Sequence, residues 1–194
     1  MERTTEWDAK RLASYIDHTY LKPDATKAII DKLCDEAVQY GFYSVCVNGM
    51  WVARCRERLA GKSPLIAAVT GFPLGSMSAE ALAYETAKAV EDGAREIDMV
   101  LPVGPLLEGD LKTVERHISL AVKAAGVPVK VILETGYLND EQKRTACQIS
   151  EAAGAAFVKT STGFGPGGAT VEDIRLMRAA VSPSVGVKAS GGVR

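Results

Sequence analysis

A lysine lies inside a short apolar run of this sequence. Lys159 follows the apolar residues 155–158, and Gly163 closes the run. Such a run predicts a buried strand. Because burial disfavours the charged form of lysine, we expect the pKa of Lys159 to fall and a neutral amine to become available. A neutral amine is the nucleophile that forms a Schiff base with a carbonyl substrate.

A second strand-like run, residues 185–192, places Lys188 in a similar setting. A cationic neighbour would depress the pKa of Lys159 further. Considered alone, Lys159 better fits a structural lysine that reaches solvent or pairs with a buried acid. The presence of the second lysine favours a reactive amine.

Acidic residues occupy similar positions in other apolar runs. Asp98 lies within the run 96–100, and Asp17 lies within 16–19, next to Thr19. Lys130 and Glu134 add further charges from the run 129–134. For Asp98, a structural ion pair with a core lysine and a role in proton transfer are both open. Burying this many ionisable groups together is costly unless they form a site.

Glycines recur at the junctions between predicted helices and strands. Four of them follow helical patterns and precede strands, as C′ glycines do: Gly41, Gly93, Gly126 and Gly154. Counting five residues on from the first, second and fourth leads to Cys46, Asp98 and Lys159. If the turns are alike, these three side chains share one face of a sheet, where Cys46 is a plain core thiol.

Two glycine-containing stretches follow the lysine strands. Thr162 and Gly163 come after Lys159, and Gly191 and Gly192 come after Lys188. Glycines at such positions let the backbone approach an anion with its N–H groups. These stretches predict phosphate binding, although glycine-rich segments also serve as simple turns.

Composition limits the classes of function. The chain has 194 residues, of which 47% are hydrophobic, and its net charge is −1. We expect a single domain over 1–194 with no nucleic-acid or membrane partner. No apolar run approaches the roughly 18 residues that span a membrane, and the N-terminal residues are too polar for a secretory signal. A cytoplasmic protein is predicted.

The sequence contains few residues that could bind a metal ion. The four cysteines have no Cys-x-x-Cys spacing, and only His18 and His117 supply imidazoles. Free thiols are expected rather than disulfides. Neither a metal site nor a cofactor is predicted.

Strand-like and helix-like segments alternate along the whole chain. Repeated βα units with apolar strands predict a parallel sheet. Polar groups recur in several strands and no Gly-x-Gly-x-x-Gly follows the first, so a TIM (β/α)8-type barrel is favoured over a doubly wound sheet. The expected strands are Tyr15–Leu21, Ser44–Asn48, Leu65–Gly71, Arg95–Pro102, Val129–Glu134, Phe157–Thr162 and Gly186–Ser190. The expected helices are Glu6–Ala13, Ala25–Tyr40, Met50–Ala60, Ala79–Asp92, Leu111–Ala125, Asp140–Ala153 and Val171–Val181, with Asp24, Ser78, Asn139 and Thr170 as N-caps.

Seven strands are one fewer than a closed barrel contains. The sequence therefore predicts a barrel that is truncated after its seventh strand and lacks the C-terminal helix and strand. It also predicts two unpaired edges that favour self-association, so a homo-oligomer is one expectation.

Together these motifs resemble deoxyribose-phosphate aldolases, which are class I aldolases on a (β/α)8 barrel. The matching stretches span nearly the whole chain: residues 16–19, 69–75, 96–100, 130–136, 158–163 and 187–194. The resemblance implies reversible cleavage of 2-deoxy-D-ribose 5-phosphate to acetaldehyde and D-glyceraldehyde 3-phosphate, without a metal or an organic cofactor.

The resemblance also implies roles for individual residues. Lys159 matches the Schiff-base lysine, Lys188 the second lysine that lowers its pKa, and Asp98 the acid that moves protons through water. Four residues match positions near the substrate phosphate: Thr162, Gly163, Gly191 and Gly192. Asp17, Lys130 and Thr19 are supporting residues. Phe164 stands where some family members carry a lysine, and the segment that completes the phosphate site on an eighth strand has no counterpart here.

Two other functions are compatible with the residues. One is a sugar-phosphate isomerase or epimerase barrel that forms no covalent intermediate. The other is an inactive barrel fragment that self-associates.

Overall fold

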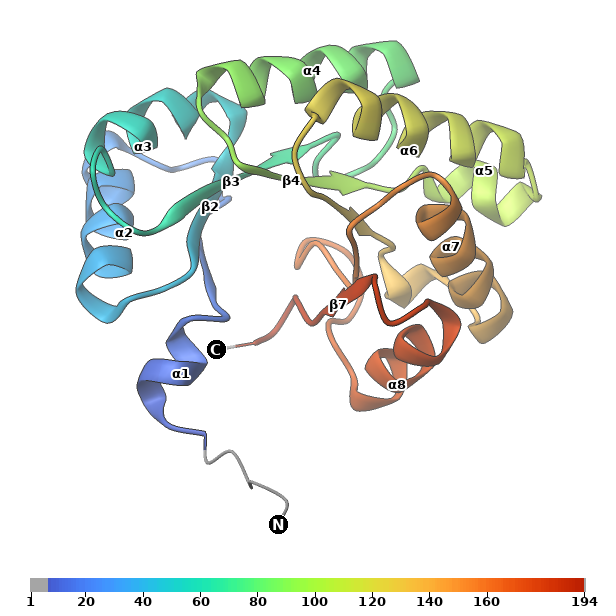
Figure 1. The fold of residues 1–194 in the computed structure, drawn as a ribbon. Coiled ribbons are helices and arrows are strands. Elements are labelled where there is room, and N and C mark those ends of the chain that lie inside the picture. Colours follow the sequence, from blue (N-terminus) through green and yellow to red (C-terminus); the bar gives the residue numbers. More distant parts are fainter. Residues whose placement is uncertain (1–6, 194) are drawn as a thin grey trace.

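Seven parallel strands pair in the order in which they occur in the chain. The computed structural model describes residues 7–193. The strands form a curled sheet with helices around its outer side (Figure 1). They are β1 (Asp17–Thr19), β2 (Ser44–Asn48), β3 (Leu65–Thr70), β4 (Glu96–Val100), β5 (Val129–Ile132), β6 (Phe157–Lys159) and β7 (Gly186–Lys188).

This order confirms the barrel-type α/β fold. A doubly wound sheet reverses its strand order at a switch point, whereas here each strand pairs with its sequence neighbours throughout. All seven predicted strands are present, and most are shorter than expected because their last residues leave the ladder to form the loops that follow.

The helices connect successive strands. They are α1 (Ala9–Ala13), α2 (Lys27–Tyr40), α3 (Val52–Arg58), α4 (Ala79–Asp92), α5 (Val103–Glu108), α6 (Leu111–Ala125), α7 (Asp140–Ala152) and α8 (Val171–Ala180), with single 3₁₀ turns η1 (Gly49–Trp51) and η2 (Thr135–Tyr137). The expected start of the first helix, Glu6, lies outside the described residues. Helix α5 was not predicted, because Gly104 and Pro105 resemble loop residues. Proline is nevertheless tolerated in the first turn of a helix.

Most of the predicted caps are confirmed. The side chains of Ser78, Asn139 and Thr170 accept backbone N–H groups at the starts of α4, α7 and α8. The prediction of Asp24 was wrong, since Thr26 caps α2. A threonine directly before the first helical residue is closer to the free N–H groups than an aspartate two positions earlier.

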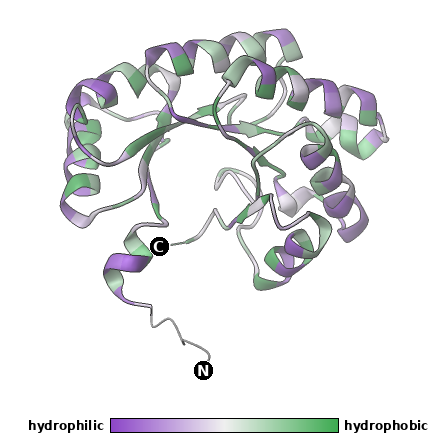
Figure 2. Ribbon diagram, in the orientation of Figure 1, coloured by the Kyte–Doolittle hydropathy of each residue, from purple (hydrophilic) through white to green (hydrophobic). Residues whose placement is uncertain are grey.

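The strands alternate between two faces. Outward residues pack under the helices in the main core, which includes Val45, Ala68, Ile97, Met99 and Val131. Figure 2 shows hydrophobic residues along the strands and more hydrophilic residues on the outer helices. The period of two therefore separates a packed outer layer from an inward face with a different composition.

The inward face is divided into an apolar and a charged part. Cys46, Ala67 and Val69 form a small apolar cluster on β2 and β3. Asp98 and Lys130 occupy the inward positions of β4 and β5 and are also buried. The charged part therefore begins on β4 and β5, next to the apolar cluster of β2 and β3.

Side chains connect the two ends of the strand order. Within the described residues β1 pairs only with β2, and β7 pairs only with β6. Lys188 Nζ of β7 nevertheless lies 2.6 Å from Asp17 Oδ2 of β1. An ion pair therefore joins the two outer strands across the inner side of the curled sheet.

Ile97, on the outward face of β4, provides a test of how the core contributes to stability. Ile97 is fully buried, so Ile97→Ala should lower the free energy of unfolding by about 2–5 kcal/mol through the lost burial and the cavity it leaves. Leu74 is 74% exposed, and Leu74→Ala should change it by less than about 0.5 kcal/mol. Urea unfolding of the three proteins measures both effects. Equal losses in the two variants would contradict this description of the core.

Candidate active site

A buried carboxylate joins two buried lysines at the centre of the charged interior. Lys159 Nζ donates to Asp98 Oδ2 at 2.6 Å, and Lys130 Nζ donates to Asp98 Oδ1 at 2.8 Å. All three side chains are at most 8% exposed. Each carboxylate oxygen of Asp98 therefore has its own ammonium partner.

Strand register brings these residues together. Asp98 pairs with Lys130 across β4 and β5, and Lys159 pairs with Ile132 across β5 and β6. Lys130 and Ile132 are two residues apart on β5 and so point to the same side. The shared face of Cys46, Asp98 and Lys159 that the glycine spacing predicted is confirmed. Asp98 contacts Lys159, and the register pairs Cys46 with Ala67 and Asp98 with Val69, two residues apart on β3.

Lys130 extends the network away from Lys159. Its ammonium donates to Glu96 Oε2 at 2.6 Å and lies 3.7 Å from Asp17 Oδ2. The Tyr43 hydroxyl donates to Glu96 Oε1 at 2.9 Å. The sequence analysis assigned no role to Tyr43 or Glu96. Glu96 lies two residues before Asp98 on the same strand, and the period of two was a signal that it faces the same interior.

Lys188 and Asp17 form the other half of the charged interior. The Asp17 side chain is 3% exposed, and the Lys188 side chain is 21% exposed. Lys188 Nζ lies within ion-pair distance of Asp17 Oδ2 but not in hydrogen-bond alignment, and Asp17 Oδ1 accepts no hydrogen bond from the described residues. Thr19, on the same strand, donates its hydroxyl to the carbonyl of Asp17 at 2.8 Å.

The expected fall in the pKa of Lys159 is wrong for this state of the site. Burial lowers the pKa of Lys159, but the charge and hydrogen bond of the adjacent Asp98 carboxylate, together with Cys46, leave that pKa above the usual lysine value. For Asp98 the effects have the opposite sign. Burial raises its pKa, but the charges and hydrogen bonds of Lys159 and Lys130 lower it to about 2. The sequence showed the burial but could not show that a carboxylate contacts the amine.

The cation that opposes this rise is also different from the predicted one. Lys130, rather than Lys188, is the positive charge that lowers the pKa of Lys159 most. Lys188 is instead directed to Asp17. Lys159 and Lys188 are partners in the β6–β7 register, but the acids divide them into separate ion pairs.

The loops after β6 and β7 are bonded to each other. The Thr160 hydroxyl donates to the carbonyl of Ser190 at 2.8 Å, and the Ser190 hydroxyl accepts the Ser161 N–H at 3.1 Å. Farther along, the Ala169 N–H donates to the Gly191 carbonyl at 3.0 Å. The sequence analysis missed Ser190 as a link between the two loops.

Three of the four residues that were predicted to bind the substrate phosphate have backbone N–H groups without a protein acceptor in the described structure. The N–H groups of Gly163, Gly191 and Gly192 donate to no protein atom in the part of the chain that the structure describes. A methyl group on Gly191 would lie 3.0 Å from Ser161 Cβ and 3.2 Å from Gly168 Cα. Only glycine fits this position, where φ is +83°.

Thr162 is arranged differently from the expectation. Its backbone N–H and its hydroxyl both donate to the Glu134 carboxylate. Both donors are therefore occupied by protein, and the direct phosphate contact predicted for Thr162 does not fit this arrangement. From the sequence alone, Glu134 was only one more charge on the fifth strand.

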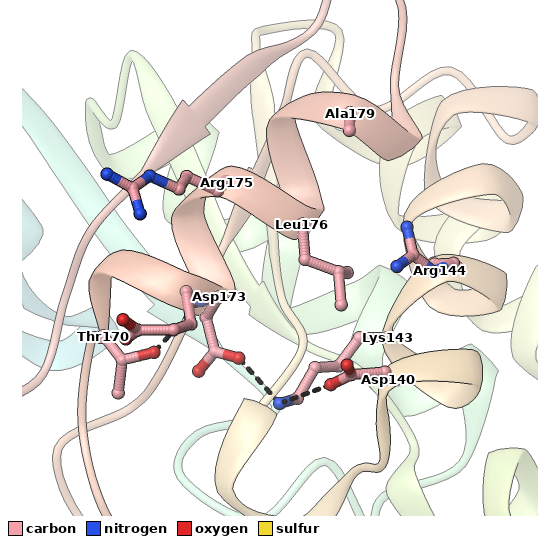
Figure 3. Close-up of a pocket in the computed structure, with 9 residues that line it drawn as sticks. Asp140, Lys143, Arg144, Thr170, Asp173, Arg175, Leu176 and Ala179 are labelled. Carbon is pink, nitrogen blue, oxygen red and sulfur yellow. Dashed lines mark hydrogen bonds and ion pairs between the residues drawn. The ribbon is translucent and has the colours of Figure 1, made fainter.

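A separate pocket lies between α7 and α8 (Figure 3). Lys143 spans it, with its ammonium 2.6 Å from Asp173 Oδ1 and 3.6 Å from Asp140 Oδ1. The pocket shares no lining residue with the buried lysine cluster. Its central charge is already paired, so the reactive groups are in the interior rather than here.

Residues 7–193 contain no group of three or more His, Cys, Asp and Glu side chains arranged to hold a metal ion. None of the helices in that range is both long and apolar enough to span a membrane.

Known proteins match both the sequence and the structure. A model of the DeoC/LacD family aldolases matches residues 11–194. The deoxyribose-phosphate aldolase of Brevibacillus brevis is 59% identical over 181 residues, which are 93% of this chain and 82% of the relative. That of Thermococcus gammatolerans is 56% identical over 188 residues, 94% of this chain and 84% of the relative. A tetrameric deoxyribose-phosphate aldolase structure from Aeropyrum pernix has a TM-score of 0.87 at 33% identity, over 96% of this chain and 80% of that chain.

The Asp98 ion pairs predict how stability depends on pH. The pKa of Asp98 lies at about 2, below the value of about 3.9 in an unfolded chain. Its stabilising contribution is therefore present above about pH 4 and lost as the pH falls towards about 2, with a magnitude of roughly 2 kcal/mol.

Asp98→Asn measures this contribution. At pH 7 the variant should be about 3–5 kcal/mol less stable than the wild type, because two buried lysines lose their carboxylate. Urea unfolding at several pH values should show the difference shrinking below about pH 4. Asp140→Asn, at a carboxylate that is 74% exposed, is the matched control with little change. A difference that stays constant down to pH 2 would contradict the assignment.

Proposed function

Because the chain belongs to the DeoC/LacD family of aldolases, we propose that it is a deoxyribose-phosphate aldolase. The reaction is the reversible cleavage of 2-deoxy-D-ribose 5-phosphate into acetaldehyde and D-glyceraldehyde 3-phosphate. The observation that carries the proposal is a buried lysine amine in contact with a buried carboxylate, Lys159 Nζ to Asp98 Oδ2 at 2.6 Å.

Lys159 is the nucleophile of this mechanism. Its amine, once deprotonated, adds to the C1 aldehyde of the open-chain sugar, and loss of water gives an iminium ion. Deprotonation of the C3 hydroxyl then breaks the C2–C3 bond and releases glyceraldehyde 3-phosphate, while the bonding electrons pass to the iminium and form an enamine. Protonation at C2 and hydrolysis release acetaldehyde and restore the amine.

Asp98 supports the cationic states of Lys159. The resting ammonium and the iminium both carry a positive charge on the same nitrogen, and the carboxylate next to that nitrogen stabilises both. Asp98 is also placed to move protons through water while the carbinolamine loses water. Lys130 shares this carboxylate and thereby limits how strongly it holds the proton of Lys159.

Lys188 is the second lysine of the site. It pairs with Asp17 at the less buried side of the cluster, where 21% of its side chain is exposed. A lysine with solvent contact is able to exchange protons with water and with the reacting hydroxyl. Asp17 and Thr19 keep Lys188 and β1 in place.

The substrate phosphate is assigned to the glycine loops. The N–H groups of Gly163, Gly191 and Gly192 are free in the described structure and belong to loops that are bonded to each other. Backbone N–H groups bind phosphate without a charged side chain. This fits a chain in which Phe164 stands where some family members carry a lysine.

Partners and location follow from the same proposal. The substrates are a sugar phosphate and aldehydes. We propose a homo-oligomer by analogy with the tetrameric relative of known structure, and a cytoplasmic location, where four free thiols stay reduced. Light scattering on the purified protein measures the assembly.

Trapping of the Schiff base tests the nucleophile. Acetaldehyde followed by borohydride should leave a reduced two-carbon adduct on Lys159, identified by peptide mass spectrometry, because the Asp98 carboxylate beside this amine stabilises the iminium ion. Lys159→Arg should abolish both the adduct and cleavage of the sugar phosphate. Lys62→Arg, at an exposed lysine, should change neither.

The same experiment separates the alternative functions. Turnover of a sugar phosphate that survives Lys159→Arg would favour an isomerase or epimerase without a covalent intermediate. Adducts on surface lysines alone, with no cleavage activity, would favour an inactive fold.

A further inference from the structure

Glu134 has a backbone conformation that few residues adopt. It follows the last residue of β5, and its φ of 55° lies in the left-handed region. It is the one non-glycine residue with positive φ in the described part of the chain. Such a conformation is unfavourable for a residue with a side chain, and it persists where surrounding contacts require it.

The side chain of Glu134 is buried without a cationic partner. It is 3% exposed, yet no lysine, arginine or histidine of the described residues forms a salt bridge with it. The other buried acids of the interior, Asp17, Glu96 and Asp98, each have a lysine partner. The carboxylate of Glu134 therefore requires another explanation.

The donors that satisfy this carboxylate come from a single residue. The Thr162 N–H lies 3.3 Å from both carboxylate oxygens, and the Thr162 hydroxyl donates to Oε2. The same hydroxyl oxygen accepts the Phe164 N–H at 3.0 Å. Glu134 thus fixes the turn 162–164, which contains the free N–H of Gly163.

The backbone on either side of Glu134 is tied to the Lys159 strand. The Leu133 N–H donates to the Lys159 carbonyl at 2.9 Å, and the Thr135 N–H donates to the Thr160 carbonyl at 3.1 Å. Between these two hydrogen bonds, the left-handed backbone conformation of Glu134 turns its side chain towards Thr162. Glu134 therefore connects the position of Lys159 with the position of the loop that follows it.

The rest of the loop packs closely against the same segment. A methyl group on Gly165 would lie 2.8 Å from the carboxyl carbon of Glu134. A methyl group on Gly136 would lie 1.8 Å from the Pro166 carbonyl oxygen. Neither position has room for a side chain, so the segment 134–136 and the loop 162–166 are in direct contact.

We propose that Glu134 is a positioning residue for recognition of the substrate's phosphate group. It holds the turn 162–164 in the form in which the Gly163 N–H donates to no described residue. This inference rests on the proposed function, because the loop is assigned to phosphate binding there. Without the carboxylate, the Thr162 donors lose their acceptor, and the loop samples other conformations.

Two variants test the proposal. Glu134→Gly removes the acceptor and relieves the left-handed backbone. We expect the KM for 2-deoxyribose 5-phosphate to rise about tenfold, because two hydrogen bonds that hold the loop are lost, while kcat falls by a smaller factor. Glu134→Gln keeps one acceptor oxygen for Thr162 and should recover part of the KM.

The preference for the phosphorylated substrate is the second readout. The ratio of kcat/KM for 2-deoxyribose 5-phosphate to that for 2-deoxyribose should fall about tenfold in Glu134→Gly. Glu151→Gln is the matched control, since the Glu151 carboxylate accepts the Ser182 N–H in a different loop. The control ratio should equal that of the wild type. An unchanged or lower KM in Glu134→Gly, or an equal loss for both substrates, would overturn the proposal.

Hydrogen exchange tests the loop without any substrate. Amide exchange in residues 162–168 should be faster in Glu134→Gly than in the wild type, with no change in β2 and β3. Unchanged exchange in 162–168 would overturn the positioning role. If the wild type gives no Lys159 adduct, the aldolase function fails, and the exchange result still decides whether Glu134 holds this loop.

Discussion

The site depends on the balance of charge inside the curled sheet. Asp98 is fully buried and accepts from two ammonium groups, and neither lysine has bulk water to replace it. A buried charge is tolerated only when it is paired and hydrogen-bonded. The charged side chains of Asp98, Lys130 and Lys159 on β4, β5 and β6 therefore depend on one another. Removing one of them would leave a buried charge without its partner.

This balance explains why the resting lysine is charged. Burial lowers the pKa of Lys159, but the charge and hydrogen bond of Asp98, together with the nearby Cys46, raise it, and the net direction is upward. The same contact favours an iminium, which keeps the positive charge on the nitrogen. In the proposed mechanism, an interior built this way stabilises the cationic states before and after addition to a carbonyl, and the neutral amine is a transient state between them.

The loops after β6 and β7, rather than the strands, hold the free backbone N–H groups. The strands place Lys159 and Asp98 to within hydrogen-bond distance, whereas the free N–H groups of Gly163 and Gly191 depend on contacts between loops. Thr160, Ser190 and Glu134 form these contacts. The residues proposed to react and the loops proposed to bind the substrate are thus held by two different sets of interactions, one in the sheet and one at its end.

The sequence by itself determined the strand order, the inward face of Asp98 and Lys159, and most of the helix caps, because period-two patterns and cap chemistry are local properties. Only the tertiary structure decided which charges contact each other. Lys188 pairs with Asp17 at the opposite edge of the sheet, and Glu134 takes both donors of Thr162. Those partners are distant in sequence, and a pKa depends on distances of a few ångströms between charges that no local pattern specifies.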